Sequence, residues 1–188
     1  MQTIQKSGLA EQTINKSRFV ALAAYCATER EVVLMLHKLA SEHNHAHHLA
    51  FAYQLKTADG IIQRMNDAGE PSGTAGRPIL QHIEGQKLVN VCVGVIRYYG
   101  GVNLGTGGLA RAYGGTAKLA IEAATRIPYM EMTTILLEID YSRLDSLSRE
   151  IDKMNGKIID KAFGEHVKIK ASVPAQEAET LRARFQSA

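Results

Sequence analysis

The run from Leu88 to Tyr99 most constrains the fold, because it is long, rich in valine and isoleucine, and nearly free of polar residues. A run of this kind is typical of a strand buried on both faces. Glycine-rich segments stand on both sides of it, and 12 of the 16 glycines fall between Gly69 and Gly115. The sequence therefore predicts a buried central strand flanked by loops that expose their backbone.

Strand and helix patterns alternate before and after this run. Thr28 begins a helix, and Glu31 can complete a capping box with it. Gly114 and Gly115 lie inside a helical pattern, where each costs about 1 kcal/mol relative to alanine, so we expect that helix to lie very close to a sheet. The predicted elements are strands at 18–27, 49–56 and 61–65, a short helix at 77–82 and a helix at 109–124.

Pro128 marks a domain boundary in the sequence. The pattern beyond it reads strand, helix, strand, strand, helix, which is most of a ferredoxin-like unit. These elements are predicted at 133–140, 142–154, 157–163, 166–173 and 174–185. We therefore expect an α+β protein with two domains, residues 1–128 and 129–188.

Composition favours a cytoplasmic protein. Hydrophobic residues make up 45% of the chain, but no stretch reaches the roughly 18 to 20 apolar residues of a membrane helix. The segment from Met1 to Ser17 is polar and lacks the apolar core of a signal peptide. Cys26 and Cys92 sit in apolar runs without zinc-ligand spacing, so we expect buried free thiols and a reducing compartment.

Positive charge is concentrated in the first part of the chain. Residues 1–131 hold 13 Lys and Arg against 10 Asp and Glu, whereas residues 132–188 hold 9 of each. An anionic partner is therefore expected to meet the first domain.

Arginine and tyrosine gather around the two glycine clusters. Guanidinium groups bind phosphates in a forked geometry, and aromatic faces stack on unpaired bases. The pattern favours phosphate or RNA binding by six residues: Arg77, Arg97, Tyr98, Tyr99, Arg111 and Tyr113.

The glycine loops themselves can expose N–H groups to a ligand. The candidate ligand-binding residues are Gly69, Glu70, Ser72, Gly73, Thr74 and Gly76 in the first loop, and Gly100, Gly101, Gly105, Thr106, Gly107 and Gly108 in the second. Tight turns and close packing are the alternative explanation, and the sequence alone leaves both open.

Other chemistries find less support in the residues. The segment 105–110 fits a dinucleotide fingerprint, but it comes late and no acidic strand end follows it. Four histidines fall within residues 43–48, without distant partners that would make a metal site. No catalytic residue, metal or cofactor is predicted. An enzyme using Glu70, Ser72 and Thr74, or a module that docks a protein partner, remains as an alternative hypothesis.

Several segments resemble the YigZ/IMPACT family. They are 16–19, 46–53, 69–76 and 97–115, and the similarity spans roughly residues 10–125. Ala50 stands where the family often has cysteine, and Ala68 where it often has a second aspartate before Gly-Glu-Pro. These departures weaken an enzymatic or metal-binding interpretation.

The resemblance implies a ribosomal protein S5 domain 2-like fold for the first domain and a ferredoxin-like fold for the second. Together these are similar to the last two domains of translation elongation factor G. Eukaryotic members of the family regulate the general amino-acid control kinase pathway through a protein partner and an additional domain that this sequence lacks, so that role does not transfer directly. Our leading hypothesis is an RNA- or ribosome-binding protein linked to translation, and it calls for no membrane contact.

Overall fold

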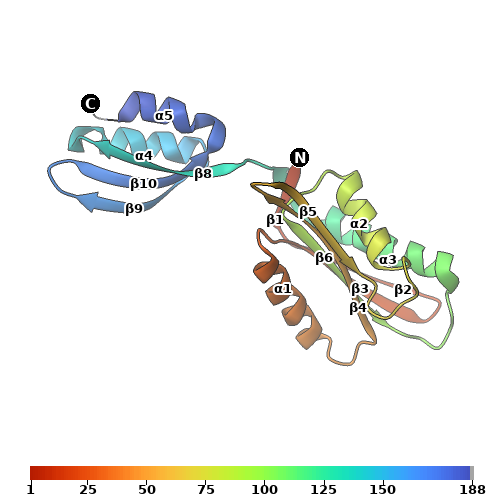
Figure 1. Cartoon of the computed structure of the whole chain (residues 1–188). Helices are drawn as coiled ribbons and strands as arrows, with labels where there is room; N and C mark the ends of the chain where they lie inside the picture. Colours follow the sequence, from red (N-terminus) through yellow and green to blue (C-terminus); the bar gives the residue numbers. More distant parts are fainter. Residues whose placement is uncertain (187–188) are drawn as a thin grey trace. The chain divides into compact units, whose positions relative to one another are not determined.

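The chain forms two compact units, Met1–Tyr129 and a second that begins at Met130. The computed structural model describes residues 1–186, and strands and helices alternate in both units (Figure 1). This confirms a two-domain protein of mixed α and β structure. Within the described residues, none of the helices is long and apolar enough to cross a membrane.

A five-stranded sheet forms the centre of the first unit. Its order is β2 (Gly8–Ile14), β3 (Ser17–Tyr25), β6 (Val91–Tyr98), β4 (His48–Thr57) and β5 (Gly60–Asn66). Neighbouring strands are antiparallel throughout. β1 (Gln2–Lys6) pairs separately with β7 (Thr125–Pro128). β1 and β2 lie in the polar segment for which the sequence indicated no element.

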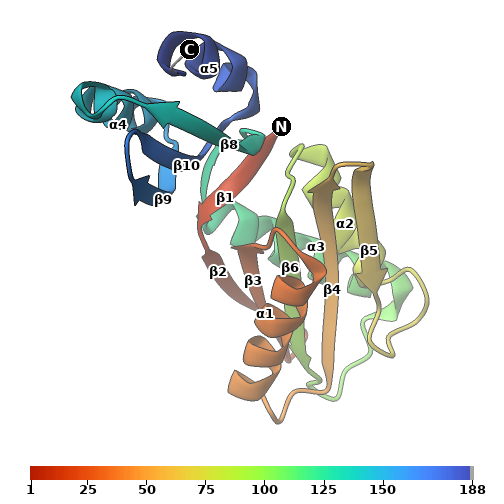
Figure 2. The same cartoon turned by 60° about the vertical axis from the view of Figure 1, so that its left-hand side comes forward.

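Helices cover both faces of this sheet (Figure 2). α1 (Glu29–Glu42) lies on one face, and α2 (Gly76–Gly85) and α3 (Gly105–Ala123) lie on the other. Thr28 caps α1 as predicted, because its hydroxyl accepts the Glu31 N–H at 3.2 Å. The Glu31 carboxylate takes the N–H of Ala27 at 2.7 Å instead of the N–H of Thr28.

β6 is buried on both faces, as its sequence predicted. Val91, Val93 and Val95 belong to the core beneath α2 and α3. The alternate residue Cys92 packs with Cys26 in the core on the opposite face. Both cysteines are buried free thiols, and burial raises the pKa of Cys26 to about 11.

α3 differs from its predicted form at two places. It begins at Gly105 and not at Leu109, so residues 105–108 are its first turn and not a loop. A Cβ on Gly114 would lie 3.3 Å from side-chain atoms of His82 and Pro78. This glycine therefore allows α2, and not a strand of the sheet, to pack closely against α3. The predicted close approach of helix to sheet is instead at Gly8 in β2, where a Cβ would lie 2.0 Å from the Ala120 carbonyl oxygen.

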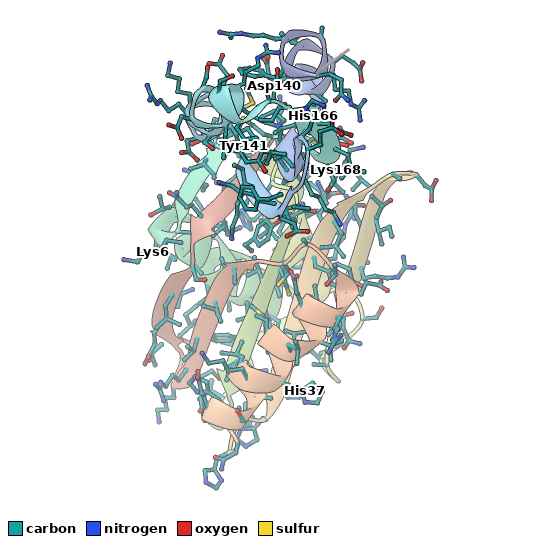
Figure 3. The ribbon with its side chains drawn as sticks, turned by 90° about the vertical axis from the view of Figure 1, so that its left-hand side faces the viewer. Lys6, His37, Asp140, Tyr141, His166 and Lys168 are labelled. Atoms are coloured by element: carbon teal, nitrogen blue, oxygen red, sulfur yellow. The ribbon has the colours of Figure 1, made fainter. Side chains whose placement is uncertain are left out.

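The second unit is a three-stranded antiparallel sheet with two helices. Its strand order is β8 (Met132–Ile139), β10 (Val167–Pro174) and β9 (Lys157–Phe163). α4 (Leu144–Lys153) and α5 (Ala178–Phe185) each follow a three-residue 3-10 turn, so they begin later than predicted. Figure 3 shows Asp140, Tyr141 and His166 in this unit, where His166 Nδ1 lies 3.1 Å from Asp140 Oδ1.

Candidate functional site

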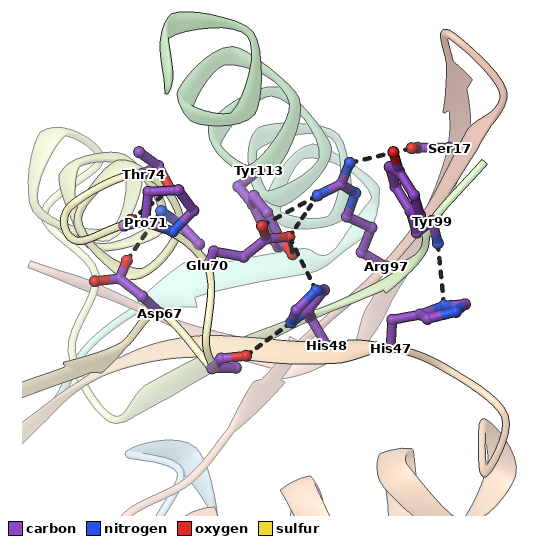
Figure 4. A network of polar contacts seen from close by, with 12 residues as sticks. Ser17, His47, His48, Asp67, Glu70, Pro71, Thr74, Arg97, Tyr99 and Tyr113 are labelled. Carbon is purple, nitrogen blue, oxygen red and sulfur yellow. Dashed lines mark hydrogen bonds and ion pairs between the residues drawn. The ribbon is translucent and has the colours of Figure 1, made fainter. Parts of the chain in front are cut away.

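A buried carboxylate organises the region between the two glycine clusters. The Glu70 side chain is only 5% exposed. Its Oε1 accepts hydrogen bonds from Arg97 Nη1 at 2.8 Å and from the Tyr113 hydroxyl at 2.7 Å (Figure 4). Arg97 Nη1 also lies 3.1 Å from Oε2. Glu70, Arg97 and Tyr113 therefore form a charge-paired cluster that links a loop, β6 and α3.

Two more side chains extend this cluster. His48 Nδ1 donates to the Ala68 carbonyl at 2.8 Å, which turns its Nε2 toward Glu70 Oε1 at 3.8 Å. Arg97 Nη2 donates to Ser17 Oγ at 3.3 Å, and Ser17 Oγ also accepts the Gly100 N–H at 3.3 Å. The starts of β3 and β4 are thereby tied to the end of β6.

The structure corrects two of the predicted RNA contacts. Arg97 is 4% exposed and Tyr113 is fully buried, so neither side chain is available to a nucleic acid in this conformation. Burial and the hydrogen bond to Glu70 raise the pKa of Tyr113, which keeps its hydroxyl protonated as a donor. Arg97 can be buried because it is paired with Glu70, whose carboxylate neutralises the guanidinium charge inside the protein.

The enzyme alternative loses its proposed base for the same reason. Both Glu70 carboxylate oxygens already accept hydrogen bonds from Arg97, so Glu70 is not a free group on a loop. Thr74 is buried, and its hydroxyl donates to the Pro71 carbonyl at 2.6 Å. Ser72 is exposed, and within residues 1–186 none of its hydrogen bonds joins its hydroxyl to a side chain that could activate it as a nucleophile.

The first glycine cluster forms the loop that leads into α2, and Asp67 binds the backbone N–H groups of this loop. Asp67 accepts N–H groups from Gly73 at 2.9 Å, Ala75 at 3.0 Å and Gly76 at 2.8 Å. A carboxylate at this place satisfies free donors at a helix N-terminus and matches the helix dipole. Burial raises the pKa of Asp67, but the three N–H groups outweigh burial and hold it below its ordinary value.

Asp67→Asn is expected to destabilise the chain by about 1 to 2 kcal/mol at pH 7, the usual range for a lost helix cap. Because the folded protein lowers the Asp67 pKa, its carboxylate stabilises the fold above about pH 4. That contribution is lost as the pH falls through the folded pKa. Urea unfolding of both proteins from pH 7 to pH 3 should show the difference shrinking in acid, and a difference independent of pH would contradict this role.

The second glycine cluster leads into α3, whose first turn is open. Leu104 stands at the N-cap without a side-chain capping bond, and no acidic residue follows in the first turn. Gly105, Thr106 and Gly107 are exposed. Next to this turn is a pocket of about 350 Å³ lined by Glu70, Pro71, Arg97, Asn103, Leu104, Gly105, Thr106 and Leu109.

The glycines divide by what a Cβ would meet. At Gly76 and Gly100 it would lie within 3 Å of the backbone of Asn66 and Lys16, so these glycines permit packing. Four others have the positive φ of tight turns: Gly69, Gly73, Gly101 and Gly105. A Cβ at Gly108 would lie 3.1 Å from the Cβ of Leu104, the residue that precedes α3. At Gly107 the only neighbour within 4 Å among the described residues is Arg111 Nη1, at 3.4 Å.

Tyr98 and Tyr99 stand at the end of β6, one half-buried and one exposed. The Tyr98 hydroxyl and His43 Nδ1 share a hydrogen bond of 2.7 Å, and the Arg18 guanidinium lies 5.2 Å from the ring centre. Tyr99 is 41% exposed but held at several points. Its N–H donates to His47 Nδ1 at 3.1 Å, its hydroxyl donates to Asn103 Oδ1 at 3.1 Å, and the Arg97 guanidinium lies 5.2 Å from its ring centre.

The remaining predicted arginines, Arg77 and Arg111, are exposed in the first turns of α2 and α3 or just beyond them. The residue list from the sequence lacked Ser17, His48, Asp67 and Asn103. Asp67 lies nine residues before Gly76, so it is outside the position immediately before a helix where a capping residue is expected from sequence. The others depend on long-range contacts that no local pattern reveals.

Three histidines of the histidine-rich segment make hydrogen bonds within the first unit. His43 bonds to Tyr98, His47 to the backbone of Tyr99, and His48 to the carbonyl of Ala68. Among residues 1–186, no group of three or more His, Cys, Asp or Glu side chains could hold a metal ion.

The fold and site define a class, a two-unit α and β protein whose first unit is an Impact N-terminal domain. The model of that domain matches residues 15–121, and a domain of unknown function, DUF1949, matches residues 137–188. The chain belongs to the IMPACT family.

Relatives in several bacteria resemble it along most of its length. IMPACT family member YvyE of Bacillus subtilis is 33% identical over 93% of this chain and 80% of its own. IMPACT family member YigZ of Escherichia coli is 31% identical over 93% of this chain and 86% of its own.

A solved structure shares this fold along nearly the whole chain. The crystal structure of a hypothetical protein has a TM-score of 0.73 and 29% identity, covering 97% of this chain and 89% of that one. The two-domain translational regulator Yih1 gives a TM-score of only 0.43 at 25% identity, covering 64% of this chain and 48% of its own.

Proposed function

We propose that this protein binds single-stranded RNA through its first unit and acts in translation, with RNA or the ribosome as partner in the cytoplasm. The translational setting comes from the family resemblance described above. We also propose that residues 1–128 form a ribosomal protein S5 domain 2-like domain and residues 129–188 a ferredoxin-like domain. The order β8-α4-β9-β10-α5 supports the second assignment.

The observation that carries the proposal is the state of Tyr99, an exposed aromatic ring that is fixed in place. Exposed tyrosines usually keep their rotamer freedom and lose it on binding, which weakens the complex. Here His47, Asn103 and Arg97 hold the backbone, the hydroxyl and the ring. A pre-organised aromatic face of this kind suits stacking on an unpaired base.

Exposed positive charge on the same unit suits a polyanion. Arg77 and Arg111 are exposed, and Lys16 is exposed beside the start of β3. The positive charge of Arg97 is neutralised by Glu70, so Arg97 supports Tyr99 and is not counted among the residues that contact phosphates along the RNA strand. The revised RNA-binding set is therefore Tyr99 for stacking, with Arg77 and Arg111 for phosphates. Tyr98 is left out because it packs with Val20, Leu39 and Ile96 on the face that α1 covers.

Tyr99→Ala is expected to weaken binding of a single-stranded RNA of about ten nucleotides by roughly 5- to 150-fold, since one stacked base contributes about 1–3 kcal/mol. The Arg77→Ala/Arg111→Ala variant should bind more weakly and reduce the slope of log affinity against log salt by about 1 for each lost phosphate contact. Fluorescence anisotropy with a 3′-labelled RNA across a salt series measures both quantities.

Matched controls are available in the same unit. Tyr25 is 48% exposed at the opposite end of β3, and Arg30 is exposed on α1. Tyr25→Ala and Arg30→Ala should leave the affinity unchanged. Wild-type protein that fails to bind RNA or ribosomes at low salt would refute the proposal, and equal losses in control and test variants would show that the binding is not at this face.

A further inference from the structure

We propose that the pocket at the start of α3 is a site for a phosphate monoester, the 5′-terminal phosphate of an RNA or of a free nucleotide. This inference deepens the proposed function and rests on it. The pocket joins both glycine clusters, because Glu70 and Pro71 come from the first and residues 103–109 from the second. Its volume of about 350 Å³ is within the range of small-ligand sites.

The first turn of α3 supplies donors for an oxyanion. Helix N-termini present free N–H groups and the positive end of the helix dipole. At α2 the carboxylate of Asp67 takes up these groups, whereas α3 has neither a capping side chain nor an acid in its first turn. α3 is 19 residues long, and Thr106 adds an exposed hydroxyl in the same turn.

A second, independent observation comes from the wall of the pocket. Arg97 lines it and is 4% exposed, yet its Nε has no hydrogen-bond partner within the described residues. A buried donor without a partner costs stability and needs an explanation. Glu70 also lines the pocket, but its carboxylate oxygens already accept hydrogen bonds from Arg97 and Tyr113, so the Glu70–Arg97 pair adds no net negative charge beside the open turn.

The glycines at this turn agree with a ligand that approaches the backbone. Each helical glycine is unfavourable relative to alanine, and packing does not require Gly107, whose hypothetical Cβ meets only Arg111 Nη1, at 3.4 Å. Bare backbone at Gly107 leaves room for an oxyanion over the N–H groups, with the Arg111 guanidinium close by.

The neighbouring aromatic face identifies the ligand as a nucleotide. Asn103 lines the pocket, and its Oδ1 accepts the Tyr99 hydroxyl at 3.1 Å. One side chain therefore joins the stacking surface to the phosphate pocket. A monoester offers three terminal oxygens to these converging donors, whereas a phosphodiester within a strand offers two.

The test compares 5′-phosphorylated and 5′-hydroxyl RNA of one sequence, both labelled at the 3′ end. We expect the phosphorylated form to bind about tenfold more tightly, the order gained from a few charge-assisted hydrogen bonds after desolvation. Thr106→Glu should abolish this preference, because a carboxylate in the first turn competes with phosphate while favouring the helix. Thr106→Gln, of equal length without charge, should keep the preference.

Titration calorimetry with uridine monophosphate separates the two sources of the phosphate. Equal affinity for both RNAs, without binding of uridine monophosphate, overturns the pocket inference and leaves the RNA proposal standing. Binding of uridine monophosphate that Thr106→Glu abolishes, in a protein that ignores RNA, supports the pocket and refutes the RNA proposal. Absence of both interactions overturns both.

Discussion

Glu70→Ala is expected to destabilise the first unit by about 3–5 kcal/mol, the cost of leaving one partner of a buried ion pair uncompensated. The variant would strand the Arg97 guanidinium, 4% exposed, and the hydroxyl of the fully buried Tyr113. A loss of this size is a large part of the roughly 5–15 kcal/mol that holds a typical protein together. Partial unfolding at room temperature is therefore within the expected outcome.

Urea unfolding followed by tyrosine near-ultraviolet circular dichroism measures the stability of the first unit specifically. The chain has no tryptophan, and six of its seven tyrosines precede residue 130, where the second unit begins. Glu70→Gln should fall between wild type and Glu70→Ala, because its amide oxygen still accepts from Tyr113 but carries no charge for Arg97.

Glu11 provides the matched control. Its carboxylate also receives two hydrogen bonds from an arginine, at 2.6 and 3.0 Å from Arg18, but both side chains are about half exposed. Exposed pairs of this kind contribute little, so Glu11→Ala should leave the midpoint nearly unchanged. If Glu70→Ala were equally mild, the buried cluster would not hold the two glycine loops in place.

Local signals predicted the elements that local physics determines. The side chain of Thr28 and the continuous apolar run of β6 act within a few residues, and both appear in the structure as expected. The start of α3 was missed because the low helix propensity of Gly105, Gly107 and Gly108 indicates a loop. Packing of the helix onto β2 and β3 outweighs that preference.

Arg97 shows where reasoning from sequence fails for the site. Its charge suggested a surface position, but β6 alternates, and Arg97 continues the Val91, Val93, Val95 series that faces α2 and α3. The period of two therefore indicated an inward side chain. Its partner Glu70 lies 27 residues away on a loop, and nothing local in the sequence pairs the two.

Gly8→Ala is expected to destabilise the first unit by about 3 kcal/mol or more, above the usual 1–3 kcal/mol for an overpacked core. A Cβ at Gly8 would lie 2.0 Å from the Ala120 carbonyl oxygen and 2.4 Å from the Ala124 amide nitrogen. Both are backbone atoms at the end of α3, so no side chain can rotate away. Relief requires β2 to separate from α3, which carries the first turn of the proposed phosphate site at its other end.

Gly85→Ala is the control for this prediction. Gly85 ends α2, and a Cβ there would have nothing within 4 Å among the described residues. The change should be neutral or stabilise the chain by up to about 1 kcal/mol, as expected for glycine replaced within a helix. The two variants add the same methyl group, so the difference between their unfolding midpoints isolates the contact of β2 with α3. Similar midpoints would mean that the helix end gives way at little cost, and that α3 is held in position mainly by the Glu70 cluster at its N-terminal half.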